Sequence, residues 1–116
     1  MLFGIDTFNA YKGNYGISIA NSQPVDRNNP VYKPLQPGWE LVNAHKNGQL
    51  TNDEYMALYF EKLHNLDAGQ VYRDLCKLVN GNKPVLLSWE KKGTVCHRYM
   101  AASWLQHELT RINDED

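Results

Sequence analysis

Apolar residues form short runs near the start and near residue 85, and helical stripes elsewhere. Residues 2–7 form a short apolar run and residues 15–20 alternate apolar with polar positions, so both are predicted to be β-strands. Residues 85–87 are continuously apolar, which is typical of a central strand buried on both faces. The first two strands either pair as an antiparallel hairpin or lie apart in one mixed sheet.

Helical spacing predicts four helices. Residues 38–46 are expected to form a short helix, and Thr51 with Glu54 forms a capping box that predicts the start of a second. Further helices are expected within 67–81, with Gly81 as the stop, and over 97–112. The apolar stripes expected to face the core on the last three helices are Tyr55, Leu58, Tyr59, Leu63 and Leu66; Val71, Leu75, Leu78 and Val79; and Ala101, Trp104, Leu105, Leu109 and Ile112.

Residues 21–37 are polar and rich in proline. Pro24, Pro30, Pro34 and Pro37 exclude a helix and a central strand there, so this segment is predicted to be a long loop. A loop of this length in a compact domain is often functional. A connection that is merely stiffened by its prolines is an equally good interpretation.

Composition fits one domain. The chain has 116 residues, of which 42% are hydrophobic and 22% are charged, as in an ordinary folded protein. The elements therefore predict a single α/β domain over residues 1–112, a layered fold with a short mixed sheet flanked by about four helices. An acidic tail, 113–116, is expected to fray.

Charge and cysteine content narrow the partners and the compartment. The chain has twelve basic and thirteen acidic residues, a balance that disfavours broad binding to duplex nucleic acid. A small local anion site remains compatible with this balance. No apolar run approaches the ~20 residues that span a bilayer, and residues 1–6 lack a signal-peptide pattern. With Cys76 and Cys96 expected to be reduced, a cytoplasmic protein is the natural interpretation. A protein partner or a homo-oligomer is not visible in the sequence.

Chemically capable side chains are concentrated within residues 84–105. A predicted buried strand ends near Glu90, and the last helix is expected to begin near Cys96, His97 and Arg98. Ligands of open α/β sheets bind outside the carboxyl ends of strands, and a helix start attracts anions. An arginine can bind a phosphate at two points, a thiolate is favoured at a helix start, and a carboxylate can act as base or nucleophile.

Structural roles for the same residues stay open. Glu90 could pair with a neighbouring lysine, Cys96 could be a small buried hydrophobe, and Arg98 could form a structural salt bridge. His97 could orient or cap a helix, while Trp89 and Trp104 fit a core better than a stacking platform. One cysteine beside one histidine lacks the spaced ligands of a zinc site, so no metal and no cofactor are expected.

This segment resembles the domain-of-unknown-function 488 family. Residues 84–90 read PVLLSWE and residues 96–98 read CHR, which is similar to that family's strand, glutamate, spacer and Cys-His-Arg helix start. Residues 35–41, LQPGWEL, and the tyrosines that follow are similar to an earlier run of the family. Residues 19–24 differ from the family's Asp-Val-Arg strand end and basic loop. The resemblance implies a small Rossmann-like α/β fold, without an established biochemical function.

The first hypothesis is a binding protein for a small anionic ligand, most plausibly a nucleotide or nucleotide-like metabolite. The helix start at 96–98 would hold the phosphate, the loop 21–37 would close over the base or sugar, and Tyr11, Tyr15 or Trp89 would stack on the base. The residues expected to contact the ligand are His97, Arg98, Trp89, Tyr15, Asn21 and Ser22.

Two other hypotheses remain. The chain could be an enzyme that acts on nucleosides or nucleotides, cleaving an N-glycosidic or phosphate-ester bond with Glu90 or Cys96 as the catalytic residue. It could instead be an interaction protein without a small-molecule site, in which Glu90 and Arg98 bridge the strand end and the helix start.

Overall fold

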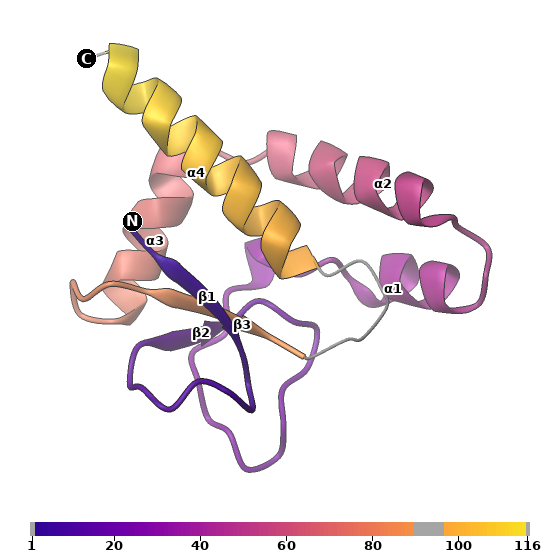
Figure 1. Cartoon of the computed structure of the whole chain (residues 1–116), viewed down its shortest axis with the longest axis horizontal. Helices are drawn as coiled ribbons and strands as arrows, with labels where there is room; N and C mark the ends of the chain where they lie inside the picture. Colours follow the sequence, from indigo (N-terminus) through magenta and orange to yellow (C-terminus); the bar gives the residue numbers. More distant parts are fainter. Residues whose placement is uncertain (1, 90–96, 116) are drawn as a thin grey trace.

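The computed structural model describes residues 2–89 and 97–115. Figure 1 shows a small sheet with helices gathered over one side of it and loops on the other. The elements in chain order are β1 (Gly4–Thr7), β2 (Gly16–Ser18), the 3-10 turn η1 (Lys33–Leu35), α1 (Trp39–Lys46), α2 (Asn52–His64), α3 (Ala68–Leu78), β3 (Val85–Ser88) and α4 (His97–Glu115). The predicted small layered α/β fold is confirmed.

Within the described residues the sheet has three strands in the order β1-β3-β2, and both pairings are parallel. The predicted central position of β3 is confirmed, and β1 and β2 lie apart in one sheet, as the second alternative predicted. The antiparallel hairpin is wrong, and the sheet is parallel instead of mixed. Leu86 and Leu87, successive residues of β3, point to opposite faces, and each is fully buried. A strand that is apolar on both faces gains most from a central place, and β3 therefore separates β1 from β2.

The two faces of the sheet are covered differently. On one face, Ile17 and Leu86 pack with the buried stripes of α2, α3 and α4 in one core cluster. On the other face, Phe8 and Leu87 form a smaller cluster with Ala20, covered by loop residues such as Tyr11. The helices thus form a single layer on one face of the sheet. The carboxyl ends of the three parallel strands lie along one edge of the sheet.

Local signals place the helix ends correctly. The Thr51 hydroxyl accepts from the Glu54 N–H at 3.1 Å, and the Glu54 carboxylate accepts from the Thr51 N–H at 2.9 Å. The bond from the Thr51 N–H to the carboxylate, together with a smaller effect of the Thr51 side chain, holds the pKa of Glu54 below its usual range. Asp67 caps α3 by accepting from the Gln70 N–H at 3.1 Å, and Gly81 follows the end of α3 with a φ of 82°.

Some predicted details differ. Leu58 and Leu78 belong to apolar stripes, yet their exposed fractions are 45% and 40%, because each lies at the margin of its stripe. The last helix continues to Glu115, so residues 113–115 of the expected frayed tail are helical. In residues 2–89 and 97–115, no helix combines the length and apolarity needed to cross a membrane.

The second half of the proline-rich segment is built into the fold. Ser18 forms a β-bridge with Val31, and the side chains of Tyr32 and Leu35 are buried. Only the first half projects, with Val25 fully exposed. From about Val31 onward the segment therefore packs against the fold, and it leads directly into α1.

Candidate functional site

A small cavity of about 70 Å³ lies at the carboxyl ends of β2 and β3. Among the described residues, four parts of the chain line it: the residues after β2, the start of α1, the residue after β3 and the first residue of α4. The lining residues are Ala20, Asn21, Ser22, Pro37, Trp39, Val42, Trp89 and His97. The cavity is thus at the edge of the sheet where ligands of parallel α/β folds bind.

His97 is held in one orientation beside this cavity. Its side chain is buried, and Nε2 lies 2.8 Å from the carbonyl oxygen of Ile19. Because a carbonyl only accepts, Nε2 carries the proton of this hydrogen bond. The imidazole also packs edge-on against Tyr59 at a centroid distance of 5.6 Å, and the Tyr59 hydroxyl donates to the Leu35 carbonyl at 2.7 Å.

Asn21 lines the cavity, and the two ends of its side-chain amide differ in their hydrogen bonding. Its Oδ1 accepts from the Gly38 N–H at 2.9 Å, which joins the end of β2 to the start of α1. Its Nδ2 is buried and has no hydrogen-bond partner among the residues that the structure describes. A buried donor without a partner costs roughly 1–3 kcal/mol, and an incoming acceptor would remove that cost.

Trp89 closes the cavity from the end of β3. Its indole Nε1 donates to the Ser22 carbonyl at 3.0 Å and also lies 3.4 Å from the Ser22 hydroxyl. The ring packs edge-on against Phe8 at 5.3 Å. Trp89 remains partly exposed, while Trp104 is buried as predicted. Trp89 therefore fixes the loop after β2 rather than belonging to the central core.

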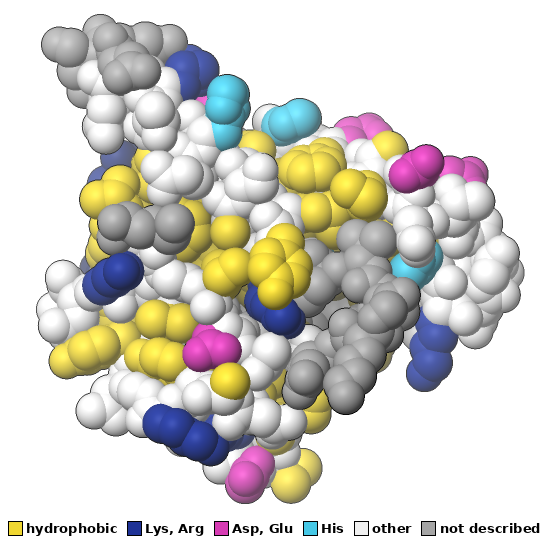
Figure 2. All heavy atoms as spheres, viewed as in Figure 1, with side chains coloured by type: hydrophobic (Ala, Val, Ile, Leu, Met, Phe, Trp, Pro, Cys, Tyr) yellow, Lys and Arg dark blue, Asp and Glu magenta, His cyan; other side chains and the backbone are white. Residues whose placement is uncertain are grey.

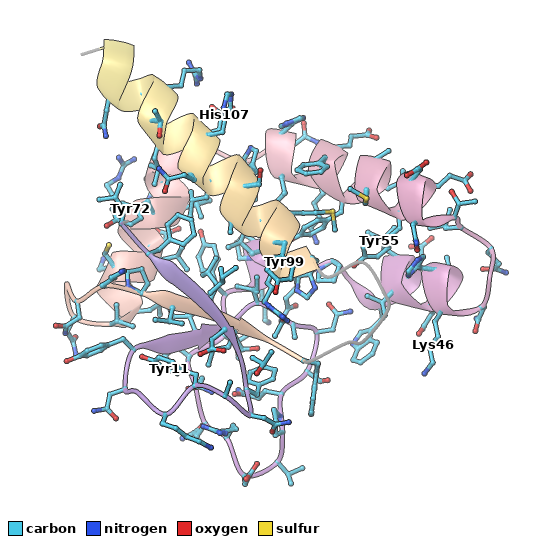
Figure 3. The ribbon with its side chains drawn as sticks, viewed as in Figure 1. Tyr11, Lys46, Tyr55, Tyr72, Tyr99 and His107 are labelled. Atoms are coloured by element: carbon cyan, nitrogen blue, oxygen red, sulfur yellow. The ribbon has the colours of Figure 1, made fainter. Side chains whose placement is uncertain are left out.

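Arg98 lies beside the site but does not line the cavity. Its Nη1 donates to the Ser88 hydroxyl at 3.0 Å and to the Trp89 carbonyl at 3.2 Å. The guanidinium also lies over the ring of Tyr99, 4.7 Å from its centroid, in the first turn of α4 (Figure 3). Only 8% of Arg98 is exposed. These contacts join the end of β3 to the start of α4, so Arg98 positions the wall of the site.

The structure does not bring every predicted site residue together. Tyr15 precedes β2, and its carbonyl accepts from the Val85 N–H at 2.9 Å. It therefore lies at the amino end of the sheet, some ~20 Å of extended chain from Asn21. Its N–H donates to the hydroxyl of Tyr11, at the same end. Glu90 and Cys96 lie outside the described residues.

Sequence reasoning missed the contribution of α1. Pro37, Trp39 and Val42 line the cavity, and the exposed fraction of Trp39 is 57%. One usable signal was present: a tryptophan directly after Pro37-Gly38, in the first turn of a helix too short for a full apolar stripe.

The charged side chains that the structure describes form neither a metal-binding cluster nor, on the face drawn in Figure 2, a continuous basic patch. In the described part of the chain, no group of three or more His, Cys, Asp or Glu side chains lies close enough to hold a metal ion. On the face drawn in Figure 2, the described Lys and Arg side chains lie apart from one another instead of forming one continuous patch.

Comparison with known families identifies the chain's relationship. Residues 11–109 match a family model described as "Active DUF488-N3 subclade". The chain belongs to the DUF488 family. The matched span contains every residue that lines the cavity, and the predicted resemblance is confirmed at the level of the family. Neither the curated proteins nor the solved structures gave a significant match to this DUF488 chain.

Proposed function

We propose that this DUF488 chain binds a small anionic ligand, most plausibly a nucleotide or a nucleotide-like metabolite, with the anionic group in the cavity between β2, β3, α1 and α4. One observation carries the proposal: the buried Nδ2 donor of Asn21 has no partner among the described residues and belongs to a side chain that lines this cavity. A phosphate or carboxylate oxygen is the acceptor that would satisfy it.

The helices add a favourable field for an anion. α1 begins at Trp39 and the described part of α4 begins at His97, and both residues line the cavity. Each helix start carries roughly half a positive charge from its unpaired N–H groups. The residue before α1, Gly38, has no side chain to cap those groups. An anion in the cavity would therefore interact with two helix starts.

The cavity is large enough for the anionic group of the ligand but not for the whole ligand. A volume of about 70 Å³ suits a phosphate or carboxylate group, whereas sites for whole small molecules usually measure about 300–1,000 Å³. A nucleotide would therefore place its phosphate inside and its sugar and base outside. Partly exposed Trp39 and Trp89 stand at the rim on that side.

A charge substitution at Asn21 tests the proposal. Asn21→Asp keeps the acceptor that faces the Gly38 N–H but replaces the Nδ2 donor with a carboxylate oxygen, which repels an anion. Calorimetry should show that inorganic phosphate and ribose 5-phosphate bind to the unaltered chain and bind at least roughly tenfold more weakly to Asn21→Asp.

The matched control is Asn43→Asp. Asn43 is an exposed residue of α1 that does not line the cavity, so this variant carries the same added charge on a nearby element. Its phosphate affinity should stay close to that of the unaltered chain. Equal affinities in Asn21→Asp and the unaltered chain, with both folded by circular dichroism, would remove the cavity as the anion site.

A further inference from the structure

A second hollow adjoins the cavity on the outer side of α1 and α2. It measures about 540 Å³ and is mainly apolar; we call it the α1–α2 groove. Its lining residues are Pro37, Gly38, Trp39, Glu40, Leu41, Ala44, Leu50 and Leu58. Pro37 and Trp39 line both hollows, so the groove and the cavity lie side by side.

We propose that the α1–α2 groove holds a flat, nitrogen-containing aromatic ring of the same ligand whose anionic group occupies the cavity. This inference rests on the proposed function and deepens it. The ligand class becomes an aromatic heterocycle with a phosphate or carboxylate on a short linker, and the ring is recognised by α1 rather than by the tyrosines near β2.

Exposed apolar area supports a ring in the groove. Trp39 and Leu58 have exposed fractions of 57% and 45%, and both line this one hollow. Large apolar side chains that share an exposed depression are typical of a binding surface. An indole offers a flat face on which an aromatic ring stacks, whatever the exact identity of that ring.

The single charge in the wall orients the ligand. Glu40 is the only charged residue that lines the groove within the described part of the chain. Its carboxylate repels an anionic group but accepts hydrogen bonds from ring N–H or amino groups. The groove therefore favours the heterocycle, while the Asn21 amide and the two helix starts favour the anion. A ligand bound the other way round would be disfavoured at both ends.

The volumes of the two hollows agree with a ring in the groove and an anionic group in the cavity. The cavity alone is too small for a heterocycle, and the groove of about 540 Å³ falls within the usual range for small-molecule sites, about 300–1,000 Å³. Together they accommodate a mononucleotide as two joined parts. A dinucleotide or a nucleic-acid chain would bring further phosphates toward Glu40, which the proposal excludes.

Two ligands of equal charge separate the groove from the cavity. Calorimetry would compare adenosine 5′-monophosphate with ribose 5-phosphate, which carries the same anion without the ring. The ring should make the nucleotide bind at least roughly tenfold more tightly. Leu58→Gln, which alters only the groove, should remove most of this advantage and leave the affinity for ribose 5-phosphate unchanged.

Leu78→Gln is the matched control, because Leu78 has a similar exposed fraction of 40% and lies on α3, outside both hollows. It should leave the affinity for both ligands unchanged. Ribose 5-phosphate binding as tightly as the nucleotide would overturn the groove proposal and leave the anion site standing. Failure of both ligands to bind would instead overturn the proposed function itself.

A second copy of the chain is the other occupant that the test detects. Sedimentation velocity over a range of concentrations should give a monomer that Leu58→Gln does not alter. A dimer that dissociates in Leu58→Gln, with no nucleotide advantage in the unaltered chain, would assign the groove to self-association and overturn the inference.

Discussion

Helices α1 and α3 have comparable lengths, eight and eleven residues, but contribute to the molecule in different ways. α3 buries Ala68, Val71 and Leu75, and its first turn is capped by the Asp67 side chain. All eight residues of α1 are described and none is buried, and Gly38 caps it without a side chain. Figure 1 shows α3 beside the sheet and α1 at the opposite side of the helical layer.

Under the proposed function, this difference separates residues that stabilise the fold from residues that contact the ligand. Ala68, Val71 and Leu75 of α3 are buried in the core, so the fold depends on them and they cannot contact a ligand. In α1, Leu41 packs against the core only in part, and Trp39 is left at the surface, where it borders both the cavity and the groove. Binding sites are commonly drawn from such weakly packed elements. Four substitutions, the last two with a control variant each, test how far this separation holds.

The largest expected effect contrasts one side chain from each helix. Leu75→Ala should lower the free energy of unfolding by about 3 kcal/mol, because it leaves a cavity at a fully buried position. Trp39→Ala removes a larger side chain but should cost less than about 1 kcal/mol, because most of it already contacts water. Urea denaturation followed by far-ultraviolet circular dichroism measures both.

Ligand affinity should respond in the opposite order. Trp39→Ala should weaken nucleotide binding strongly, and Leu75→Ala, where folded, should leave it nearly unchanged. If Trp39→Ala destabilised the fold as much as Leu75→Ala, α1 would be a core element and the contrast between the helices would fail.

Local sequence patterns predicted the structural side of this contrast well. The capping box at Thr51, the buried stripe of α3 and the central strand β3 all follow from residue types at fixed spacings. Those signals are local, since a cap or a stripe needs only its own few residues. The tertiary arrangement was harder, and the parallel order β1-β3-β2 replaced the expected hairpin or mixed sheet.

Of the residues that line the cavity, the sequence predicted only some. Asn21, Ser22, Trp89 and His97 do meet at one cavity, because the carboxyl ends of parallel strands share an edge. Tyr15 continues the alternating pattern of Ile17 and Ile19, but it lies at the amino end of β2, away from the cavity. Alternation shows which face of a strand a residue occupies, but not which end of the sheet carries the cavity. The exposure of Trp39 is set by tertiary packing, for which its place after Pro37-Gly38 was the one local signal.

The comparison of stabilising and exposed residues also applies at the start of α4. There the buried side chain of Arg98 makes polar contacts with the end of β3. Arg98→Met keeps much of the side-chain volume but removes the bonds to the Ser88 hydroxyl and the Trp89 carbonyl. We expect a loss of about 2 kcal/mol in the free energy of unfolding, since buried acceptors lose a charged donor. Urea denaturation measures the loss.

An exposed arginine on α3 supplies the control for this variant. Arg73 donates to the Gln70 side chain at the surface, at 3.1 Å. Arg73→Met should change the free energy of unfolding by no more than about 0.5 kcal/mol. Equal effects at the two positions would mean that Arg98 does not hold the strand end and the helix start together.

The smallest expected effect concerns a polar contact that links the two compared regions. Tyr32, in the segment that leads into α1, donates from its hydroxyl to the Asp74 carboxylate of α3 at 2.7 Å. This bond, and a second from Gln70, hold the pKa of Asp74 below its ordinary value of 3.8. Burial, together with the Asp74 carboxylate, raises the pKa of Tyr32.

The depressed pKa fixes the sign of the pH dependence. Since Asp74 has a lower pKa in the folded state, its contribution is complete above pH ~4 and is lost as the pH falls through the folded-state pKa. Tyr32→Phe should therefore cost about 1 kcal/mol at pH 7, a value reduced by solvent screening of a partly exposed carboxylate. Its cost should shrink when the urea midpoints are measured near pH 3.

Tyr72→Phe provides the reference for this pH dependence. The Tyr72 hydroxyl donates to the Leu2 carbonyl at 3.1 Å, an acceptor that does not titrate in acid, so its cost should be the same at both pH values. A cost for Tyr32→Phe that is equally independent of pH would show that the Asp74 charge does not tie α3 to the approach of α1. The two helices would then be linked through the apolar core alone, and the weak packing of α1 would extend back to Tyr32.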